Sequence, residues 1–372
     1  MNVFFSAGEA SGDAYAAAMA TAIGSAAKAD PDLSVTLAGI GGKRFRETGA
    51  KLIADSSTWG AISITEALKV YPRVVRSYYR IKSYLRTESP GLFIPIDFGY
   101  VNIRLARYAK AQGWKVLYFV PPGSWRRDRQ GKDLAAITDA ISTPFSWSAE
   151  LLQAKGCKAT WFGHPIKQLL VDRKVGRSPE ASERIAVLPG SRSHEIDQNL
   201  PLLAQCDLEP VEFGLAPSTD VARFEAEWKR LAPGRTNDRF TQADVYGVLT
   251  RSRAAIVCSG TATLEAALCR CPMVVIYKFP KIAEIEAKLV RFKRPKFVAL
   301  PNILLDRSVV PELIQEAATP EALKSEVHKL LSDPEQRRAQ IAAFDELDEL
   351  LGPSDAISKT SELAIQMIKE GL

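Results

Sequence analysis

The chain has 372 residues, of which 46% are apolar and 25% charged. This is the composition of a folded globular protein and excludes a disordered or fibrous one. Single hydrophobic cores stop growing at about 250 to 300 residues, so the length predicts two packed domains with a cleft between them. The 49 Lys and Arg residues against 43 Asp and Glu give a net charge of +6. That basic excess favours anionic partners such as nucleotides, phospholipid surfaces or nucleic acid without choosing among them.

The cysteines and the N-terminus indicate a cytoplasmic protein. Five cysteines are an odd number and lie in apolar context, so we expect no disulfide framework. Cys269 and Cys271 are too close for a zinc knuckle, and the chain has only three histidines, so no metal site is expected. The first residues show no basic segment followed by a long apolar one, so no signal peptide is expected, and no apolar run approaches the roughly 18 residues of a bilayer span. Any membrane contact is therefore expected to be peripheral.

Short β-branched or aromatic runs alternate with helical stretches almost throughout, which is typical of parallel sheets wrapped by crossover helices. In chain order, the first half is predicted to contain strands at 2–6, 34–38, 91–96, 115–120 and 158–162. The second half is predicted to contain strands at 185–188, 210–215, 254–258, 273–277 and 297–300. After Pro301 only helices are expected, broken at Pro320, Pro334 and Pro353.

Gly163-His164-Pro165 punctuates the chain after the last strand of the first half, and the domain boundary is placed there. The predicted fold class is thus α/β, with two doubly wound Rossmann-like domains, a cleft between them and a helical C-terminal tail. The first domain is predicted over 1–163 and the second over 164–353. The C-terminal helix, 354–372, is expected to return to the first domain and complete it.

The first chemical feature is the segment Ser6 to Asp13 (SAGEASGD), which leads from strand 2–6 into an alanine-rich helix. Its small residues give backbone freedom, a cap and N–H groups at a helix N-terminus. An ordinary turn is the simpler interpretation. However, the segment lies at the carboxyl end of a strand, where open α/β sheets bind ligands, and a turn alone gives no reason for an exposed Glu9.

Two loops of small residues open onto helices in the second half, Leu188 to Arg192 and Ser259 to Thr263. Such loops, one of them carrying an Arg, can cradle a diphosphate, and Glu265 can accept hydrogen bonds from a ribose. The alternative is two capped turns with a solvated Arg, but two such loops in one domain favour nucleotide binding. The donor-site candidates are Gly190, Ser191, Arg192, Glu195, Ser259, Gly260, Thr261, Thr263 and Glu265.

Asp97 stands at the carboxyl end of a strongly apolar strand, in the segment Ile96 to Asn102 (IDFGYVN). A carboxylate that faces the cleft there can act as general base for a hydroxyl acceptor. It can also be the N-cap of the following helix, and the sequence supports the two interpretations about equally.

Residues 71–86 (YPRVVRSYYRIKSYLR) contain five basic residues and no acid. At about 100° per residue, three arginines share one helix face and the apolar residues share the opposite one. Such faces are usually just solvated, but cations interleaved with aromatic rings also suit an anionic headgroup surface, as does the basic stretch 278–296. No nucleic-acid motif accompanies the charge, so nucleic acid is not expected as a partner. The membrane candidates are Arg73, Arg76, Tyr78 and Arg80.

Together these motifs resemble the lipid A disaccharide synthase family, which are inverting glycosyltransferases of the GT-B fold. Each motif alone is weak, but the set runs in the family's order over almost the whole chain. The matching segments are Ser6 to Asp13, Gly39 to Gly42, Glu66 to Leu68, Ile96-Asp97 with Asn102, Gly163 to Pro165, Leu188 to Arg192 with Glu195, Ser259 to Thr261 with Leu264-Glu265, Cys271 to Val275, and Leu300 to Leu304.

The resemblance implies transfer of an acylated glucosamine from UDP-2,3-diacylglucosamine to 2,3-diacylglucosamine 1-phosphate, in lipid A and lipopolysaccharide biosynthesis. Asp97 would be the general base, and Glu9, in the crevice near the acceptor, is the second catalytic candidate. Arg192 and the 259–263 loop would neutralise the leaving diphosphate without a metal, and Asn302 would approach the donor. The remaining acceptor-side candidates are Ser11, Gly12, Asp13, Glu66, Asn102 and Trp125. The implied partners are a UDP-linked acylated sugar, a lipid acceptor and an anionic surface of the inner membrane, on its cytoplasmic side. No cofactor is implied, and a homodimer stays open.

Departures from the family pattern concentrate in the first half, which holds the acceptor in GT-B enzymes. After Trp125 the second Trp of the family's Trp-x-Trp-Arg is missing, Tyr100 stands in place of an acid, and Ser146 stands in place of a Glu. A UDP-sugar is therefore expected as donor, while the acceptor can differ. Two alternatives stay open: a non-hydrolysing UDP-sugar epimerase of the same fold, and a paralogue without turnover that binds a nucleotide sugar or a lipid.

Overall fold

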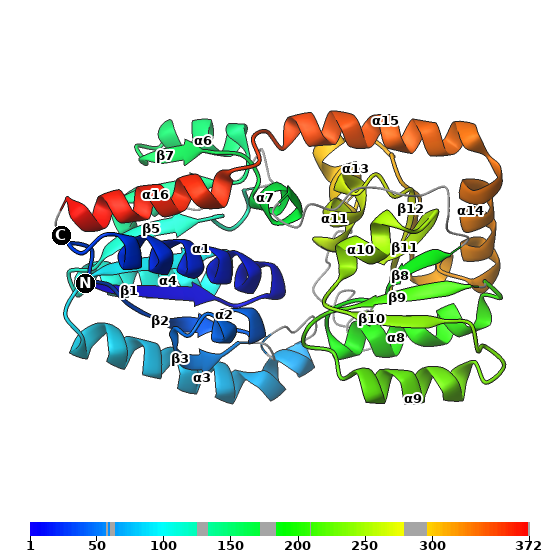
Figure 1. The fold of residues 1–372 in the computed structure, drawn as a ribbon, viewed down its shortest axis with the longest axis horizontal. Helices are drawn as coiled ribbons and strands as arrows, with labels where there is room; N and C mark the ends of the chain where they lie inside the picture. Colours follow the sequence, from blue (N-terminus) through cyan, green and yellow to red (C-terminus); the bar gives the residue numbers. More distant parts are fainter. Residues whose placement is uncertain are drawn as a thin grey trace. The chain divides into compact units, whose positions relative to one another are not determined.

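The computed structural model describes residues 1–56, 59, 64–124, 133–171, 184–208, 210–278 and 296–370. The chain divides into two compact units (Figure 1). The first comprises Met1–Ala61, Thr65–Gln168 and Leu351–Leu372, and the second comprises Ile62–Ile64 and Leu169–Leu350. The first unit is therefore built from two distant parts of the sequence, coloured blue to green and red in Figure 1.

A seven-stranded parallel sheet forms the centre of the first unit, in the order β3-β2-β1-β4-β5-β6-β7. Its strands are β1 (Asn2–Ala7), β2 (Thr36–Gly41), β3 (Lys51–Asp55), β4 (Leu92–Ile96), β5 (Lys115–Phe119), β6 (Ala140–Thr143) and β7 (Ala159–Trp161). Its helices are α1 (Ala10–Ala29), α2 (Lys43–Glu47), α3 (Ile64–Thr87), α4 (Gly99–Ala111), α5 (Leu134–Ile137), α6 (Ser146–Gln153) and α16 (Ala356–Lys369), and α7 (Pro165–Val171) leads into the second unit.

Both faces of this sheet are apolar because successive side chains of a buried strand point to opposite sides. On one face, α3, α4, α5 and α6 bury a core that includes Phe4, Phe93, Ile81, Leu105 and Leu152. On the other face, Tyr15 of α1 packs on Phe119 of β5, with ring centroids 6.0 Å apart, and α16 packs against α1. The C-terminal helix is therefore part of the first unit's layer structure.

The second unit has a six-stranded parallel sheet in the order β10-β9-β8-β11-β12-β13. Its strands are β8 (Ile185–Leu188), β9 (Val211–Leu215), β10 (Arg239–Gln242), β11 (Ala254–Cys258), β12 (Met273–Tyr277) and β13 (Glu312–Ile314). Its helices are α8 (Ser193–Gln205), α9 (Val221–Leu231), α10 (Val245–Thr250), α11 (Ala262–Leu268), α13 (Leu300–Leu305), α14 (Pro320–Ser332) and α15 (Pro334–Leu350).

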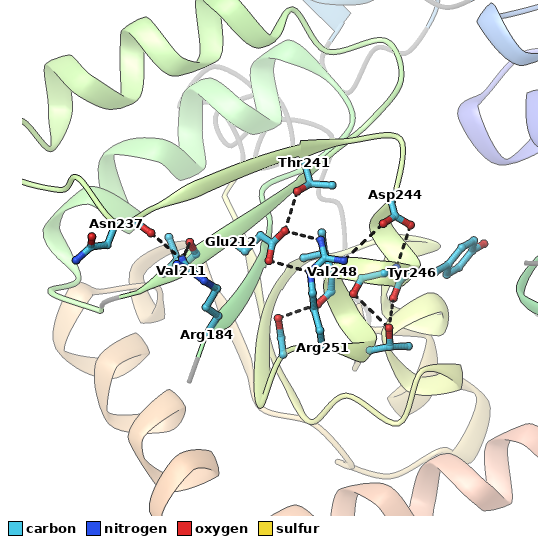
Figure 2. A network of polar contacts seen from close by, with 12 residues as sticks. Arg184, Val211, Glu212, Asn237, Thr241, Asp244, Tyr246, Val248 and Arg251 are labelled. Carbon is cyan, nitrogen blue, oxygen red and sulfur yellow. Dashed lines mark hydrogen bonds and ion pairs between the residues drawn. The ribbon is translucent and has the colours of Figure 1, made fainter. Parts of the chain in front are cut away.

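A polar network fastens α10 to the edge of this second sheet (Figure 2). Glu212 of β9 is 2% exposed and accepts hydrogen bonds from Thr241 Oγ1 at 2.7 Å and Arg251 Nε at 3.0 Å. Arg251 also lies 3.6 Å from the carboxylate of Asp244, which caps α10 through the N–H of Gly247. Burial raises the pKa of Glu212, but the hydrogen bonds from Arg251 and Thr241 outweigh it and hold the pKa below its ordinary value. The network therefore stabilises the fold through a charged, fully bonded carboxylate.

The predicted α/β class with two parallel sheets is confirmed, but the last predicted strand is wrong. Residues 297–299 form no strand and α13 begins at Leu300, because Pro301 suits the first turn of a helix and cannot donate to a strand ladder. The expectation that strands stop at Pro301 is also wrong, since β13 forms the edge of the second sheet. Strands β3, β6 and β10, each of five residues or fewer, were not predicted either.

Candidate functional site

Each sheet has a switch point, where neighbouring strands lead to helices on opposite faces, and open α/β sheets bind ligands beyond the carboxyl ends of the strands at this point. In the first unit it lies between β1 and β4, where Ala7 pairs with Ile96. In the second unit it lies between β8 and β11, where Leu188 pairs with Val257. The four loops that the sequence analysis selected follow these four strands.

Asp97 follows β4 directly and has a left-handed backbone, with φ 46°, and Phe98 after it has φ 49°. This conformation costs a residue other than glycine about 1–2 kcal/mol, and such strain clusters at functional sites. The N-cap residue of α4 is Phe98, and no side chain caps the helix. The interpretation of Asp97 as the N-cap is therefore wrong, and its half-buried carboxylate has no capping role.

The electrostatic environment of Asp97 favours its protonated form. Burial raises the pKa of Asp97 to about 7, and the negative charge of Glu9 adds to the rise. Glu9 is exposed and is the N-cap residue of α1, although its side chain makes no capping hydrogen bond. Ser11, half-buried, and Gly12, buried, follow in the first turn of α1. A carboxylate whose pKa lies near neutrality suits a general base at pH 7.

Asn102 and Tyr118 hold the backbone of this loop. The buried Asn102 donates Nδ2 to the carbonyl oxygens of Ser6, Ile96 and Asp97, at 2.9, 3.1 and 3.0 Å, and its Oδ1 accepts from Ser6 Oγ at 2.6 Å. Tyr118 of β5, also buried, donates its hydroxyl to the Asp97 carbonyl at 2.9 Å. The predicted acceptor contact of Asn102 is therefore corrected, because its amide is satisfied inside the chain.

Ser6 as a bonding partner and Tyr118 altogether escaped the sequence analysis. Each carries a hydroxyl within the buried, mostly apolar part of its strand. A buried hydroxyl almost always finds a hydrogen-bond partner. A hydroxyl within a buried strand is therefore the signal in the sequence that could have identified both residues.

Asp13 has a structural role as well. It is 7% exposed and accepts hydrogen bonds from the N–H groups of Gly42, Arg44 and Phe45, at 2.5, 3.0 and 3.1 Å, where α2 begins. Burial raises the pKa of Asp13, and the three backbone hydrogen bonds lower it by less. The predicted acceptor-side role is corrected: Asp13 fastens α2 to α1.

In the loop after β8, Glu195 determines the backbone shape. It is 4% exposed, and its Oε2 accepts from the N–H groups of Ser191 and Arg192 at 2.9 and 3.2 Å, while Oε1 accepts from Arg192 Nη1 at 2.8 Å. Gly190 has φ +121°, and a Cβ on it would lie 2.5 Å from the Cβ of Glu195, so only glycine fits there. The predicted donor contact of Glu195 is therefore corrected to a positioning role, which orients Arg192.

In the loop after β11, two side-chain hydroxyls donate hydrogen bonds to backbone carbonyl groups. Ser259 Oγ donates to the Val298 carbonyl at 2.8 Å, and Thr263 Oγ1 donates to the Gly260 carbonyl at 2.8 Å. The N–H groups of Gly260 and Thr261 donate to no acceptor among the described residues. Thr261 is half-buried and caps nothing with its hydroxyl, and Glu265 lies half-buried one turn into α11. This loop therefore presents N–H groups, one hydroxyl and one carboxylate.

Asn302 is closed off from a ligand. It is 1% exposed, its Nδ2 donates to Val310 O and Glu312 Oε1 at 2.9 and 2.8 Å, and its Oδ1 accepts from the N–H groups of Val309 and Val310 at 2.7 and 2.9 Å. These bonds use the whole capacity of the amide. The predicted donor contact is corrected: Asn302 holds the turn between α13 and β13.

The basic helix α3 covers its apolar face with the sheet of its own unit. Ile81, Tyr84 and Leu85 are buried in the core, and Val74 and Tyr78 are packed against it. Tyr78 is only partly buried there, and its contact with a membrane stays a prediction. The exposed residues of α3 include two tyrosines, Tyr71 and Tyr79, and four arginines that form no ion pair within the described part of the chain, Arg73, Arg76, Arg80 and Arg86.

Some predicted residues lie outside the described ones, namely Trp125, the side chain of Glu66, and residues 279–295 of the second basic stretch. Within the described ranges, no three His, Cys, Asp or Glu side chains converge as a metal ion would need. No helix of the described chain is long and apolar enough to cross a membrane.

Comparison with known proteins finds relatives over nearly the whole chain. The family model described as lipid-A-disaccharide synthetase matches residues 3–368. The lipid-A-disaccharide synthase of Trichlorobacter lovleyi is 31% identical over 388 residues, which cover 99% of this chain and 98% of that protein.

Solved structures share the fold at low sequence identity. A glycosyltransferase of kitacinnamycin has a TM-score of 0.61 at 14% identity and covers 99% of both chains. A UDP-GlcNAc 2-epimerase of Neisseria meningitidis bound to UDP-GlcNAc has a TM-score of 0.53 at 12% identity and covers 100% of both chains. The predicted GT-B type of fold is confirmed. This fold serves both a transferase and an epimerase, so the fold alone does not determine the reaction. The sequence similarity to the lipid-A-disaccharide synthase family is what distinguishes the two chemistries.

Proposed function

This chain belongs to the lipid-A-disaccharide synthase family and is a glycosyltransferase of lipid A biosynthesis; from that premise we propose that Asp97 and the loops at the two switch points carry out the transfer. The donor is UDP-2,3-diacylglucosamine, and the acceptor is 2,3-diacylglucosamine 1-phosphate. The products are lipid A disaccharide 1-phosphate and UDP. The family relationship favours neither the epimerase nor the paralogue without turnover.

In this proposal the first unit holds the acceptor and Asp97 is the base. The acceptor hydroxyl gives its proton to Asp97 as its oxygen attacks the anomeric carbon of the donor. The bond from that carbon to the diphosphate breaks, its electron pair leaves with UDP, and the configuration inverts. The pKa of Asp97 near 7 and its position after β4 support this role; burial, and after it the charge of Glu9, keeps the pKa high.

The second unit is proposed to hold UDP. A leaving diphosphate gains negative charge, which fixed N–H dipoles and a guanidinium group stabilise without reorganisation. The N–H groups of Gly260 and Thr261 have no other acceptor among the described residues, and Glu195 orients Arg192. Glu265 is proposed to accept hydrogen bonds from the ribose hydroxyls.

We further propose that α3 docks peripherally on the inner membrane, from the cytoplasm. Acyl-chain substrates partition into lipid, so docking brings the site to them. The exposed arginine face of α3 supports this, since each cation near an anionic leaflet contributes on the order of 1 kcal/mol. Tyr71 and Tyr79 are the exposed aromatic residues of α3 among the described side chains, whereas Tyr78 is partly buried against the core.

The observation that carries the proposal is the position of Asp97 directly after β4 at the switch point, where burial and then the charge of Glu9 raise the pKa of its carboxylate to about 7. Asp97→Asn keeps the shape and removes the basicity. Release of UDP from UDP-2,3-diacylglucosamine is expected to require the lipid acceptor and to fall by about 100-fold or more in this variant, with the UDP affinity unchanged in calorimetry. Asp30→Asn, at the exposed end of α1, is the control and should keep wild-type turnover. Near wild-type turnover of Asp97→Asn would exclude Asp97 as the base, and UDP release that is indifferent to the acceptor would exclude this transfer.

A further inference from the structure

Three residues that follow β4 and β5 have an unfavourable, left-handed backbone conformation. Asp97 and Phe98 after β4 have φ 46° and 49°, and Val120 after β5 has φ 52°. None of them is glycine. Such conformations persist only where additional contacts hold the backbone in place. We therefore ask which contacts hold the main chain of Asp97.

Those contacts converge on one atom, the carbonyl oxygen of Asp97. It accepts from Tyr118 Oη at 2.9 Å and from Asn102 Nδ2 at 3.0 Å, while the Asp97 N–H donates to Phe119 O at 3.2 Å. Tyr118 and Asn102 are both completely buried. The main chain of Asp97 is thus held from β5 on one side and from α4 on the other.

We propose that Tyr118 and Asn102 are positioning residues that hold the left-handed main chain of Asp97 and so aim its carboxylate at the acceptor hydroxyl. This inference rests on the proposed role of Asp97 as the base. Neither residue touches a substrate, and each acts through the Asp97 carbonyl. A hydroxyl lost from Tyr118 leaves that carbonyl with one donor, which allows the backbone to relax and the carboxylate to turn away.

Tyr118→Phe is the cleanest test, because Asn102 also ties Ser6 and Ile96 and its loss disturbs the sheet. The variant keeps the buried ring and removes only the hydroxyl. We expect kcat to fall about 10-fold, as misplacement of a reacting group does, with the KM for the UDP-linked donor unchanged. Tyr84→Phe is the matched control: Tyr84 is 8% exposed in the same hydrophobic cluster and has no contact with Asp97, so kcat should stay at the wild-type value.

A double-mutant cycle distinguishes positioning from a general structural effect. In the Asp97→Asn background the base is already absent, so Tyr118→Phe should lower kcat no further, although it should shift the melting temperature equally in both backgrounds. An equal 10-fold fall of kcat in both backgrounds would overturn the inference. So would a wild-type kcat of Tyr118→Phe in an enzyme that Asp97→Asn inactivates. A fully active Asp97→Asn variant would instead overturn the proposed function itself.

Discussion

Two carboxylates lie at the first switch point, and their surroundings separate their properties. Asp97 is half-buried and Glu9 is exposed. The pKa of Asp97 in the folded chain, about 7, exceeds the ordinary value of 3.8 because of burial and then of Glu9. The protonated Asp97 therefore favours the fold below about pH 3.8, and that contribution is lost as the pH rises through 7. The ionised form, which can act as a base, is the less stable one, as is common at active sites.

Glu9→Gln tests this pairing of charges. The variant removes a like charge, so the pKa of Asp97 should fall. In the wild type, kcat/KM should rise with pH through about 7 as Asp97 ionises, and in Glu9→Gln this acid limb should move to lower pH. The measurement is a pH profile of kcat/KM between about pH 5 and 9. Glu47→Gln, which removes an exposed charge from α2, should leave the limb in place. An acid limb that does not move, or moves upward, in Glu9→Gln would contradict the pairing.

At the scale of elements, apolar runs identified most of the strands that lie inside each sheet, such as β1 and β11, while the four-residue inner strand β6 was missed. Strands β3 and β10 were missed as well. These two are edge strands and are partly exposed. Edge strands carry charged and polar residues that weaken the apolar signal. Helical periodicity likewise separated the two faces of α3, but it contains no information about what covers the apolar face, which proved to be the sheet.

The loops of the site were predictable from their positions after strands, whereas the roles of many of their side chains were not. Asp13, Asn102 and Asn302 bond to backbone groups that only the folded chain brings near, such as the N–H groups of residues 42–45 for Asp13. In a sequence, a carboxylate or an amide looks the same whether it binds a ligand or a loop. The hydrogen-bond partners decide, and they are read only from the folded chain: those of Asp13 lie 29 to 32 residues away, and those of Asn302 lie 7 to 10 residues away.

The exposed face of α3 gives a prediction at this scale. Replacing Arg73, Arg76 and Arg80 by Gln should reduce sedimentation with anionic vesicles at low salt, because the attraction is electrostatic and salt screens it. UDP affinity should not change. The control replaces Lys324, Lys329 and Arg338, which are exposed on α14 and α15, and removes the same charge from the second unit. If the wild type fails to sediment at low salt, or if both triple variants lose binding equally, α3 is not the docking surface.

At the scale of the whole molecule, the two chain segments that connect the units are bound to each other within the first unit. The His164 N–H donates to Leu351 O at 2.8 Å, Lys167 Nζ donates to Gly352 O at 2.6 Å, and Gln168 Oε1 accepts from Ile357 N at 2.7 Å. The chain therefore leaves the first unit and returns to it along neighbouring paths.

Gly163→Ala tests how tightly these segments meet. Gly163 has φ +99°, and a Cβ on it would lie 2.0 Å from Pro353 O, whereas Gly156 has φ +80° with no atom within 4 Å of such a Cβ. Gly156→Ala should cost only the backbone strain, about 1–2 kcal/mol, and Gly163→Ala should cost at least about 2 kcal/mol more. Melting temperatures of both variants give the comparison. Equal losses of stability in the two variants would mean that the segment around Pro353 moves away from the new Cβ at no energetic cost.

The return of the chain to its first unit also sets an order of events during synthesis. A ribosome delivers the N-terminus first, and domains generally begin to fold as they emerge. The side of α1 that packs against α16 then stays exposed until the entire second unit has been translated, because α16 is synthesised last. The buried residues of α16 include Ile357, Ala364 and Ile368. The second unit can thus reach its native state before the first, and the nascent chain carries an apolar helix face of the kind that chaperones shield.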